Sequence, residues 1–369
     1  MNINQNKQQN HSYYMRLALQ QAHTTLGNTK TNPSVGCVIA SKDHVISAGS
    51  TSINGRPHAE KNAINLSKNI IRNCNLYVTL EPCSHYGKTP PCTNIITRKK
   101  VKKVFFSIND PDKRSFNKSS NKLRKKGIYV QRGILKKDIN LFYRSYIKNK
   151  KSNLPFVTGK LAISKDYYSI NKNSKWITNK FSRGRVHLMR SNHDCLITSS
   201  QTIIDDNPRL TCRIPGLNDK TPTRIIFDRN LRVPITAKII KESLLYPTII
   251  FCNQFHNRNK KIKLLKKNKV RVYKVPLDQD GNLDLRKSLI KIKKLGFSRI
   301  FLESGINLII NFLTNNLIDD FKLFKSNKNL GNIGNGNFKK YYKIFLSNKK
   351  KYIEKVNLFK DTLTTYRLK

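Results

Sequence analysis

The sequence contains no run of about 18 or more uncharged apolar residues, the length that a membrane-spanning helix requires. Its first residues are polar and lack the apolar core of a secretory signal, so we expect no cleaved leader. Cysteine is sparse and odd in number, with 7 in 369 residues. This count argues against a disulfide scaffold and favours the reducing environment of the cytoplasm.

Acidic residues are also scarce: the chain has 21 Asp and Glu and 72 Lys and Arg, which gives a net charge of +51. Such a charge, taken alone, favours a polyanionic partner such as nucleic acid. The excess is spread over both halves of the chain, however, and Lys, Asn and Ile, which AT-rich codons encode, are all abundant. We therefore expect a composition bias and no specific nucleic-acid partner, with binding of a polyanion as the alternative.

The length suggests two domains, and strand-like apolar segments that alternate with helical patterns predict an α/β fold. In the first half we expect helices at 12–26, capped by Ser12, at 58–66 and, after a loop at 81–92, up to about 100. We expect strands at 35–40, 45–48, 76–80 and 104–108, and turns at 42–44 and 110–112. In the second half we expect strands at 156–163, 195–199, 223–227, 248–252, 270–275 and 299–303, and helices at 180–191, 257–268, 284–295 and 306–315. The polar segment 148–153 is the predicted linker, which gives domains at 1–147 and 154–369.

His58, Cys83 and Cys92 form a candidate metal centre. His58 is followed by Ala59-Glu60, and each cysteine follows a proline. One imidazole and two thiolates suit one Zn²⁺ per chain and leave a fourth position open for water. Zinc lowers the pKa of such a water toward ~7, and Glu60 lies close enough to move a proton without binding the metal. The same order of residue types is typical of zinc nucleobase deaminases.

The cysteines enclose eight residues, where the common deaminase pattern has two. Together with Thr31-Asn32-Pro33-Ser34-Val35-Gly36, Pro57-His58-Ala59-Glu60 and Thr79-Leu80-Glu81-Pro82, this spacing resembles the bifunctional deaminase–reductase of bacterial riboflavin biosynthesis, and the resemblance covers essentially the whole chain. It implies a cytidine-deaminase-like α/β/α sandwich followed by a dihydrofolate-reductase-like α/β domain, in a cytoplasmic homo-oligomer. It also implies deamination of 2,5-diamino-6-ribosylamino-4(3H)-pyrimidinone 5′-phosphate and then reduction of the ribosyl group to ribityl with NADPH.

In the first half, the resemblance makes Glu60 the catalytic proton carrier, and three further polar residues are candidate substrate contacts. Asn32 could bond the pyrimidine edge, and its alternative is an ordinary turn residue before Pro33. His85 and Lys88 could contact the base or the phosphate, and their alternative is solvation of the loop between the cysteines.

In the second half, the resemblance rests on the segments 174–178, 194–200, 205–213 and 303–305. It implies cofactor contacts at Ala162, Trp176, Thr202, Asp206, Gly305, Ile306, Asn307, Leu308, Ile309, Ile310 and Asn311. It implies substrate contacts at Ser174, Arg190, Leu210, Arg213 and Glu303, where an arginine suits the phosphate because a guanidinium can bind it through two parallel hydrogen bonds. Lys160 is a further candidate for polarising the opened sugar, or else a solvated strand lysine.

Three departures from the family pattern fall in the second half, one of which is a connection to Trp176 that is two residues shorter than expected. The expected Ser-Leu-Asp-Gly turn is Ser164-Lys165-Asp166-Tyr167, and the expected Ala-Pro-Lys-Leu-Leu-Gly is Ser326-Asn327-Lys328-Asn329-Leu330-Gly331. They leave open a deaminase with a degenerate reductase domain. A nucleic-acid deaminase is opposed by the cysteine spacing, and a basic protein with structural zinc is opposed by Glu60.

Overall fold

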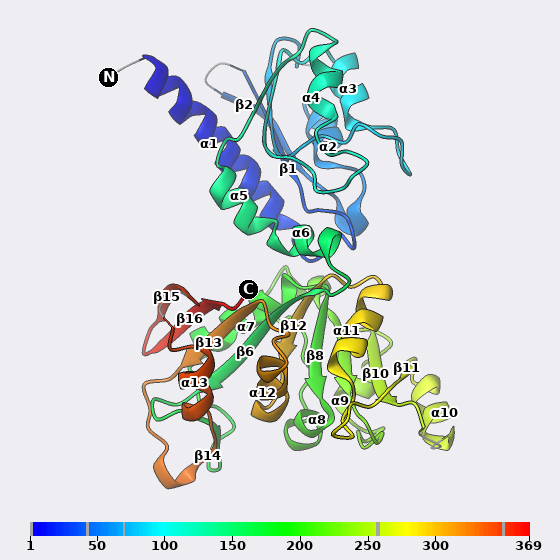
Figure 1. Ribbon diagram of the computed structural model, residues 1–369, viewed down its shortest axis with the longest axis vertical. Coiled ribbons are helices and arrows are strands. Elements are labelled where there is room, and N and C mark those ends of the chain that lie inside the picture. Colours follow the sequence, from blue (N-terminus) through cyan, green and yellow to red (C-terminus); the bar gives the residue numbers. More distant parts are fainter. Residues whose placement is uncertain (1–2, 42–43, 69–70, 256–258, 349–350) are drawn as a thin grey trace. The chain divides into compact units, whose positions relative to one another are not determined.

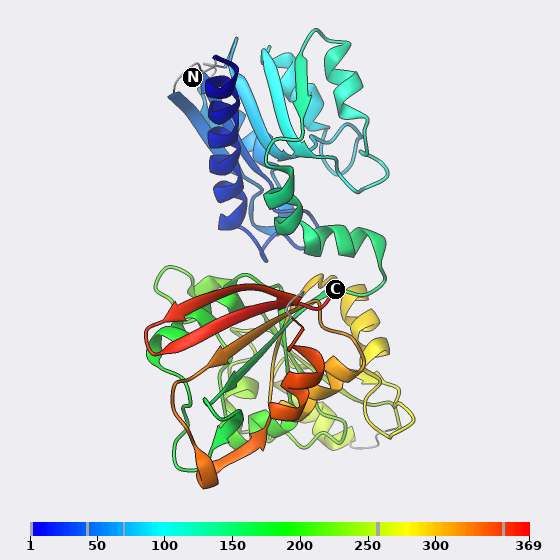
Figure 2. The ribbon, with the colours of Figure 1, turned by 60° about the vertical axis from the view of Figure 1, so that its left-hand side comes forward.

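The computed structural model describes residues 3–41, 44–68, 71–255, 259–348 and 351–369. It divides the chain into two compact units, Met1–Ser152 and Asn153–Lys369 (Figure 1). Within the described ranges, no helix is both long and apolar enough to cross a bilayer. Each unit has its own mixed sheet covered by helices (Figure 2).

The first unit is built on a five-stranded sheet of order β2-β1-β3-β4-β5, in which β1 runs antiparallel to β2 and β3 and the last three strands are parallel. The strands are β1 (Gly36–Ser41), β2 (His44–Ser50), β3 (Asn75–Leu80), β4 (Lys103–Ile108) and β5 (Tyr129–Arg132). The helices are α1 (Ile3–Thr24), α2 (Ala59–Leu66), α3 (Cys92–Arg98), α4 (Ser119–Arg124), α5 (Lys136–Phe142) and α6 (Arg144–Lys151), with a short 3-10 turn at Ile53–Gly55. In Figure 1, α1 and α5 lie on one side of the sheet and α2, α3 and α4 on the other. Helices on both faces explain why β3 and β4 are nearly continuous apolar runs.

Helix α1 corrects one expectation, because it begins at Ile3 and Ser12 lies inside it instead of capping it. The polar residues before Ser12 have no apolar spacing, so periodicity could not detect this part of the helix. The buried face, which includes Met15 and Ala18, is the predicted one. Gly36 on β1 allows the close contact with α1, since a Cβ there would lie 1.8 Å from the Ala18 carbonyl oxygen.

The first four residues of the predicted linker at 148–153 form the end of α6, which continues through Lys151. Tyr146 on this helix is buried, whereas Lys151 at its end is exposed. The boundary between the compact units falls after Ser152. Of the predicted turn at 42–44, residues 42 and 43 lie outside the described residues, as do residues 257 and 258 of the predicted helix 257–268.

The second unit is built on a nine-stranded sheet of order β11-β10-β9-β8-β12-β6-β13-β16-β15, with a separate two-stranded ribbon of β7 and β14. Neighbours are parallel from β11 to β13, and β16 and β15 add antiparallel strands at one edge. The strands are β6 (Phe156–Ile163), β7 (Tyr168–Asn171), β8 (Cys195–Ser199), β9 (Thr223–Phe227), β10 (Thr248–Asn253), β11 (Arg271–Val275), β12 (Arg299–Glu303), β13 (Asp320–Lys325), β14 (Gly334–Asn337), β15 (Tyr352–Leu358) and β16 (Asp361–Arg367). The helices are α7 (Lys180–Ser191), α8 (Ser200–Asp206), α9 (Lys238–Lys241), α10 (Asn259–Lys267), α11 (Leu285–Lys294), α12 (Ile306–Thr314) and α13 (Lys339–Phe345), with 3-10 turns at Asn218–Lys220 and Gly331–Ile333.

The six strands expected in this unit are all present, and the sequence pattern missed β7 and the four strands from β13 onward. Because β6, β8, β9 and β12 are parallel, their carboxyl ends meet at one edge of the sheet. Ligands of parallel α/β sheets bind at this edge. It is there that Glu303 and Gly305 are placed, at the end of β12 and before α12.

Candidate active sites

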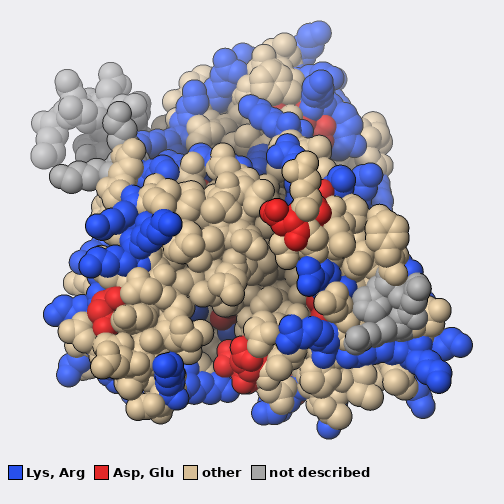
Figure 3. Space-filling model, turned by 60° about the horizontal axis from the view of Figure 1, so that its bottom comes forward, with Lys and Arg blue, Asp and Glu red and all other residues tan. Residues whose placement is uncertain are grey.

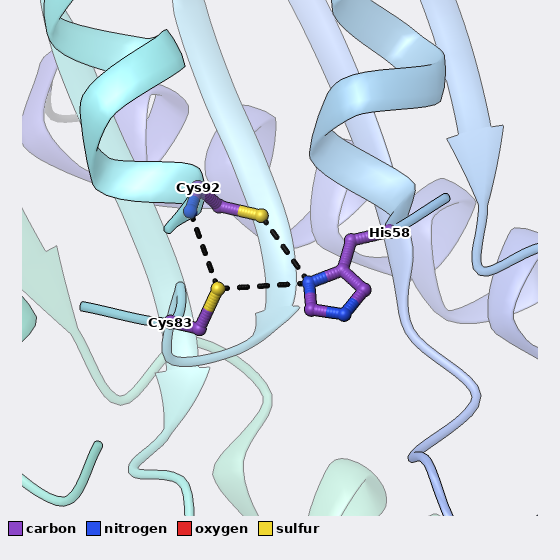
Figure 4. Close-up of side chains that lie close together, drawn as sticks. All are labelled: His58, Cys83 and Cys92. Carbon is purple, nitrogen blue, oxygen red and sulfur yellow. Dashed lines mark hydrogen bonds between the residues drawn. The ribbon is translucent and has the colours of Figure 1, made fainter. Parts of the chain in front are cut away.

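The first candidate site is formed by His58, Cys83 and Cys92, which come together from three segments (Figure 4). His58 immediately precedes α2, Cys83 lies in the loop after β3, and Cys92 is the first residue of α3. The His58 Nδ1 atom lies 3.6 Å from the Cys83 Sγ and 3.4 Å from the Cys92 Sγ, and the three possible ligand atoms lie within 4.8 Å of one another. An imidazole nitrogen and two sulfurs at this spacing fit a zinc ion with one position left for water.

All four ionisable side chains of this cluster have shifted pKa values, and a hydrogen bond with Cys83 raises the pKa of His58 and that of Cys92. Hydrogen bonds from Cys92 and His58 lower the pKa of Cys83 to about 4, so that the thiolate, which is the form that binds metal, is present at neutral pH. Glu60 lies in the first turn of α2 and is 3% exposed. Burial, together with the neighbouring Cys83, raises the pKa of Glu60 to about 7. A carboxyl group with this pKa can both accept and release a proton near neutral pH.

A cavity of about 400 Å³ opens over this cluster, and all three predicted substrate contacts of the first unit line it. Asn32 donates a hydrogen bond from Nδ2 to the Gly55 carbonyl at 3.0 Å, and His85 Nδ1 lies 2.9 Å from the Ser115 hydroxyl. Lys88 completes the set. The structure therefore places Asn32, His85 and Lys88 in one cavity with Glu60 and two of the candidate zinc ligands, His58 and Cys83.

The cavity also has charged lining residues that the sequence did not single out. Arg56 Nη1 lies 3.5 Å from His58 Nε2 and donates a hydrogen bond to Thr89. Asp112 forms ion pairs with Arg114 at 2.6 Å and with Lys150 at 2.9 Å. The sequence analysis interpreted the segment of Asp112 only as a turn and that of Lys150 as a linker. The local pattern therefore did not indicate that these two residues line the cavity.

The second candidate site lies at the carboxyl ends of β6 and β12. The Glu303 carboxylate accepts hydrogen bonds from Arg190 Nε and Nη2, both at 2.8 Å, and Arg190 Nη1 donates to the Thr211 carbonyl at 2.8 Å. Lys160 is the register partner of Glu303 on the neighbouring strand. Burial lowers the pKa of Lys160, although the Glu303 carboxylate opposes that shift.

The remaining predicted substrate residues lie on loops of the same unit. The Arg213 side chain is exposed, and its backbone N–H donates to His187 Nδ1 at 3.1 Å. Leu210 is buried in the core, so it can offer a ligand little beyond its backbone. Ser174 is exposed, and its hydroxyl accepts a hydrogen bond from the Trp176 N–H at 3.3 Å.

Hydroxyl groups and a helix amino terminus mark the candidate cofactor site. The Thr202 hydroxyl lies 3.0 Å from the Ser199 hydroxyl and 3.3 Å from that of Ser304, and it accepts a hydrogen bond from the Gly305 N–H at 3.1 Å. Gly305 is the N-cap residue of α12. Hydroxyls and helix-terminal amides are donors suited to a pyrophosphate, so this donor set fits a dinucleotide such as NADPH.

The other predicted cofactor residues differ in how far their side chains are exposed to solvent. Trp176 is 51% exposed, and its neighbour Lys175 donates to the Asp206 carbonyl at 3.2 Å, which joins two of the predicted segments. Ala162 lies near the end of β6. Within Gly305–Asn311, the Ile306 and Ile309 side chains belong to the hydrophobic core, so these two could meet a cofactor only through their backbone.

The two altered segments, 164–167 and 326–331, lie side by side. Asp166 accepts hydrogen bonds from the N–H groups of Leu330, at 3.0 Å, and Gly331, at 2.8 Å, and so joins the two altered segments. Tyr167 has a φ of +74°, the left-handed conformation that a glycine would adopt without strain. Lys325 Nζ lies 4.0 Å from the centre of the Tyr167 ring. The altered turn is thus held in the glycine-like conformation by packing.

Comparison with known proteins adds an independent line of argument. Residues 155–357 match the family model of the RibD C-terminal domain, and residues 8–108 match that of the cytidine and deoxycytidylate deaminase zinc-binding region. The riboflavin biosynthesis protein RibD of Bacillus amyloliquefaciens is 32% identical over 314 residues, 85% of this chain and 83% of that protein. The chain belongs to the RibD family. RibD of Aquifex aeolicus is 33% identical over 323 residues, 86% of this chain and 87% of that protein.

Solved structures agree with the RibD assignment. A diaminohydroxyphosphoribosylaminopyrimidine deaminase/5-amino-6-(5-phosphoribosylamino)uracil reductase from Thermotoga maritima superimposes with a TM-score of 0.83 at 27% identity, over 98% of this chain and all of that one. RibD of Acinetobacter baumannii gives a TM-score of 0.81 at 27% identity and covers 98% of this chain and 100% of that chain. These findings confirm the predicted family, the cytidine-deaminase-like and dihydrofolate-reductase-like folds, and a bifunctional enzyme of riboflavin biosynthesis with a zinc-dependent deaminase and an NADPH-dependent reductase.

Proposed function

We propose that residues 1–147 deaminate 2,5-diamino-6-ribosylamino-4(3H)-pyrimidinone 5′-phosphate. We propose that residues 154–369 then reduce the ribosyl group of 5-amino-6-(5-phosphoribosylamino)uracil to ribityl. The observation that carries the proposal is the convergence of His58, Cys83 and Cys92 on one point beside the buried Glu60. The substrate names follow those of the Thermotoga maritima relative.

In the first unit, His58, Cys83 and Cys92 would hold one Zn²⁺, which supplies a Lewis acid and lets a water molecule act as a nucleophile near neutral pH. Glu60 accepts a proton in the closed end of the cavity and delivers it to the departing amino group. Asn32 holds the pyrimidine edge through its amide. His85 and Lys88, on the loop between the cysteines, bind the ribosyl phosphate end of the substrate.

In the second unit, the hydrogen bonds of Arg190 and the exposure of Arg213 indicate different roles for these two predicted substrate residues. Arg190 gives its Nε, Nη1 and Nη2 donors to Glu303 and Thr211, so it positions the Glu303 carboxylate. Arg213 is exposed and is left to bind the substrate phosphate. Lys160, half-buried beside Glu303, donates a hydrogen bond to the opened sugar and favours hydride arrival at its C1.

The proposed cofactor contacts are the remaining residues of the second site. Thr202 and the Gly305–Asn311 turn receive the pyrophosphate, and Trp176, Ala162 and Asp206 border the dinucleotide. The substrate contacts at Ser174 and Leu210 belong to the same proposal. The enzyme would act in the cytoplasm as a homo-oligomer without a specific nucleic-acid partner.

Glu60→Gln tests the deaminase assignment, because an amide of nearly the same size cannot carry the proton. Ammonia release should fall by roughly 10²- to 10⁴-fold, while zinc content and NADPH oxidation on the deaminated substrate are unchanged. The matched control is Asp138→Asn, the same loss of charge on the exposed face of α5, which should leave all three readouts unchanged. Ammonia release within about tenfold of the wild type would refute the role of Glu60.

The reductase assignment has its own readout in the wild-type chain. NADPH oxidation should require the deaminated pyrimidine phosphate and should persist in the Glu60→Gln variant. Brisk ammonia release without any NADPH oxidation would instead support a deaminase with a degenerate reductase domain, which the family comparison does not favour.

A further inference from the structure

Positive charge alone does not identify a phosphate site in this protein. Figure 3 shows Lys and Arg side chains scattered over one face of the molecule, as expected for a chain with 72 of them. A site that selects a phosphate needs cations that the fold holds together beside a cavity. Arg114 and Lys150 meet this condition, because both line the cavity over the zinc cluster.

One carboxylate brings Arg114 and Lys150 together. Asp112 Oδ2 accepts a hydrogen bond from Arg114 Nη2 at 2.6 Å and another from Lys150 Nζ at 2.9 Å. Asp112 Oδ1 accepts a hydrogen bond from Arg114 Nε at 2.9 Å. Both cationic groups therefore contact the same oxygen atom, so they lie close enough together for one phosphate to reach both.

The carboxylate does not cancel the charge of this pair. Hydrogen bonds from Arg114 and Lys150 lower the pKa of Asp112, so this group is ionised and sets one negative charge against two positive ones. The contacts with Asp112 occupy two of the five N–H donors of the guanidinium and one of the three of the ammonium group. The pair thus keeps a net positive charge and donors for a further anion.

The fold fixes where the two cations lie. Tyr146 is buried one turn before Lys150 on α6, and the Lys150 Nζ lies 5.5 Å from the centre of the Tyr146 ring. The Tyr146 hydroxyl donates a hydrogen bond to Asp110 Oδ1 at 3.0 Å, and the Asp112 N–H donates to the same oxygen at 2.9 Å. These contacts hold α6 against the loop that carries Arg114.

This loop also contacts the loop between the two cysteines. Ser115 follows Arg114 in the chain, and the Ser115 hydroxyl lies 2.9 Å from His85 Nδ1. In the proposed function, His85 binds the ribosyl phosphate end of the substrate, while the pyrimidine lies at the zinc ligands and Glu60. A phosphate that extends past His85 therefore comes to the loop of Arg114.

We propose that Arg114 and Lys150, held together by Asp112, bind the 5′-phosphate of the deaminase substrate and make the deaminase selective for the phosphorylated compound. The inference rests on the proposed function of the first unit and adds to the contacts of His85 and Lys88. A phosphate monoester carries close to two negative charges near neutral pH, and it forms short, charge-assisted hydrogen bonds with guanidinium and ammonium groups. The same riboside without its phosphate gains little from either cation.

Ammonia release by the full, zinc-loaded chain tests this with two compounds, the phosphorylated pyrimidine and the same riboside without phosphate. For Arg114→Gln and for Lys150→Gln, the KM for the phosphorylated compound should rise by about tenfold or more, the range of one charge-assisted hydrogen bond. The kcat for that compound and the KM for the riboside should stay within about twofold, because the lost contact is made equally before and during the reaction. Ribose 5-phosphate, used as a competitive inhibitor, should lose affinity by the same factor as the substrate.

The controls are Lys113→Gln and Lys151→Gln, which remove the exposed lysine next in the chain to each tested residue. Neither lysine is part of the cavity lining, so both KM values should be unchanged.

The outcomes separate this inference from the proposed function. An unchanged KM for the phosphorylated compound in either tested variant would overturn the inference and leave the deaminase proposal intact, as would a wild-type protein with equal KM for the two compounds. Equal weakening of both compounds, with unchanged zinc content, would show a structural role and would also refute the assignment to the phosphate. A wild-type protein that releases ammonia from neither compound would overturn the proposed function as well.

Discussion

Replacement of Glu81 by alanine should destabilise the first unit more than the replacement of any exposed residue, because the Glu81 carboxylate accepts hydrogen bonds from the loop between Asp110 and Ser119. Glu81 follows β3 and is 3% exposed. It accepts hydrogen bonds from the N–H groups of Asp110 at 3.3 Å, Asn117 at 2.9 Å and Ser119 at 3.0 Å, and from the Ser119 hydroxyl at 2.9 Å. The segment that it fixes carries Asp112 and its ion-pair partners at the edge of the cavity.

The size of the effect follows from these contacts. Each buried donor that loses a charged acceptor costs about 1–3 kcal/mol, and the costs of neighbouring groups do not add fully, so we expect about 3–5 kcal/mol for Glu81→Ala. With a urea dependence of about 2 kcal/mol per molar for a unit of this size, the midpoint should fall by roughly 2 M. Glu81→Gln keeps one acceptor oxygen and should lose about half as much.

Urea-induced zinc release, followed with a chromogenic chelator, reports unfolding of the first unit. The only tryptophan, Trp176, lies in the second unit and serves as an internal reference whose transition should not move. Asp138→Ala is the control for loss of an exposed carboxylate and should change stability by less than about 1 kcal/mol. A midpoint of zinc release that stays within roughly 0.3 M, about the error of the measurement, would refute the reasoning.

Three further predictions concern zinc, the altered turn and a half-buried histidine. Cys83→Ser should lose stoichiometric zinc in metal analysis, because serine is a far weaker ligand, and full retention would remove Cys83 from the ligand set. Tyr167→Ala should be less stable than Tyr167→Gly by about 1 kcal/mol in urea unfolding, since only the alanine variant keeps the strain of a positive φ, and the reverse order would contradict this explanation. Burial, with Arg190 and Arg213 nearby, lowers the pKa of His187 to about 4, so its ring proton resonance should not titrate near pH 6.5. Because the unfolded chain then binds the extra proton first, the free energy of unfolding should fall as the pH drops from about 6.5 toward 4.

The candidate zinc centre could be predicted because its information is local. His58 and Glu60 lie two residues apart at the start of a helix, and each cysteine follows a proline on one short loop, so a fixed spacing suffices. The sheet of the second unit was predictable where its strands are buried on both faces, as for β8 and β10. It was missed at β15, whose residues are largely exposed and therefore have no hydrophobic signal.

The sequence by itself thus determined the family, the two α/β folds and the side chains that we propose as metal ligands and as proton carrier. Tertiary structure decided which distant residues share a site. Lys150 reaches Asp112 from a segment 38 residues later, and Arg190 reaches Glu303 across 113 residues. The sheet alone makes Lys160 the neighbour of Glu303, through the pairing of β6 with β12. The physical reason is that strand order and register place residues by hydrogen bonding between backbones, and backbone pairing leaves no periodic signal that identifies its partner in the chain.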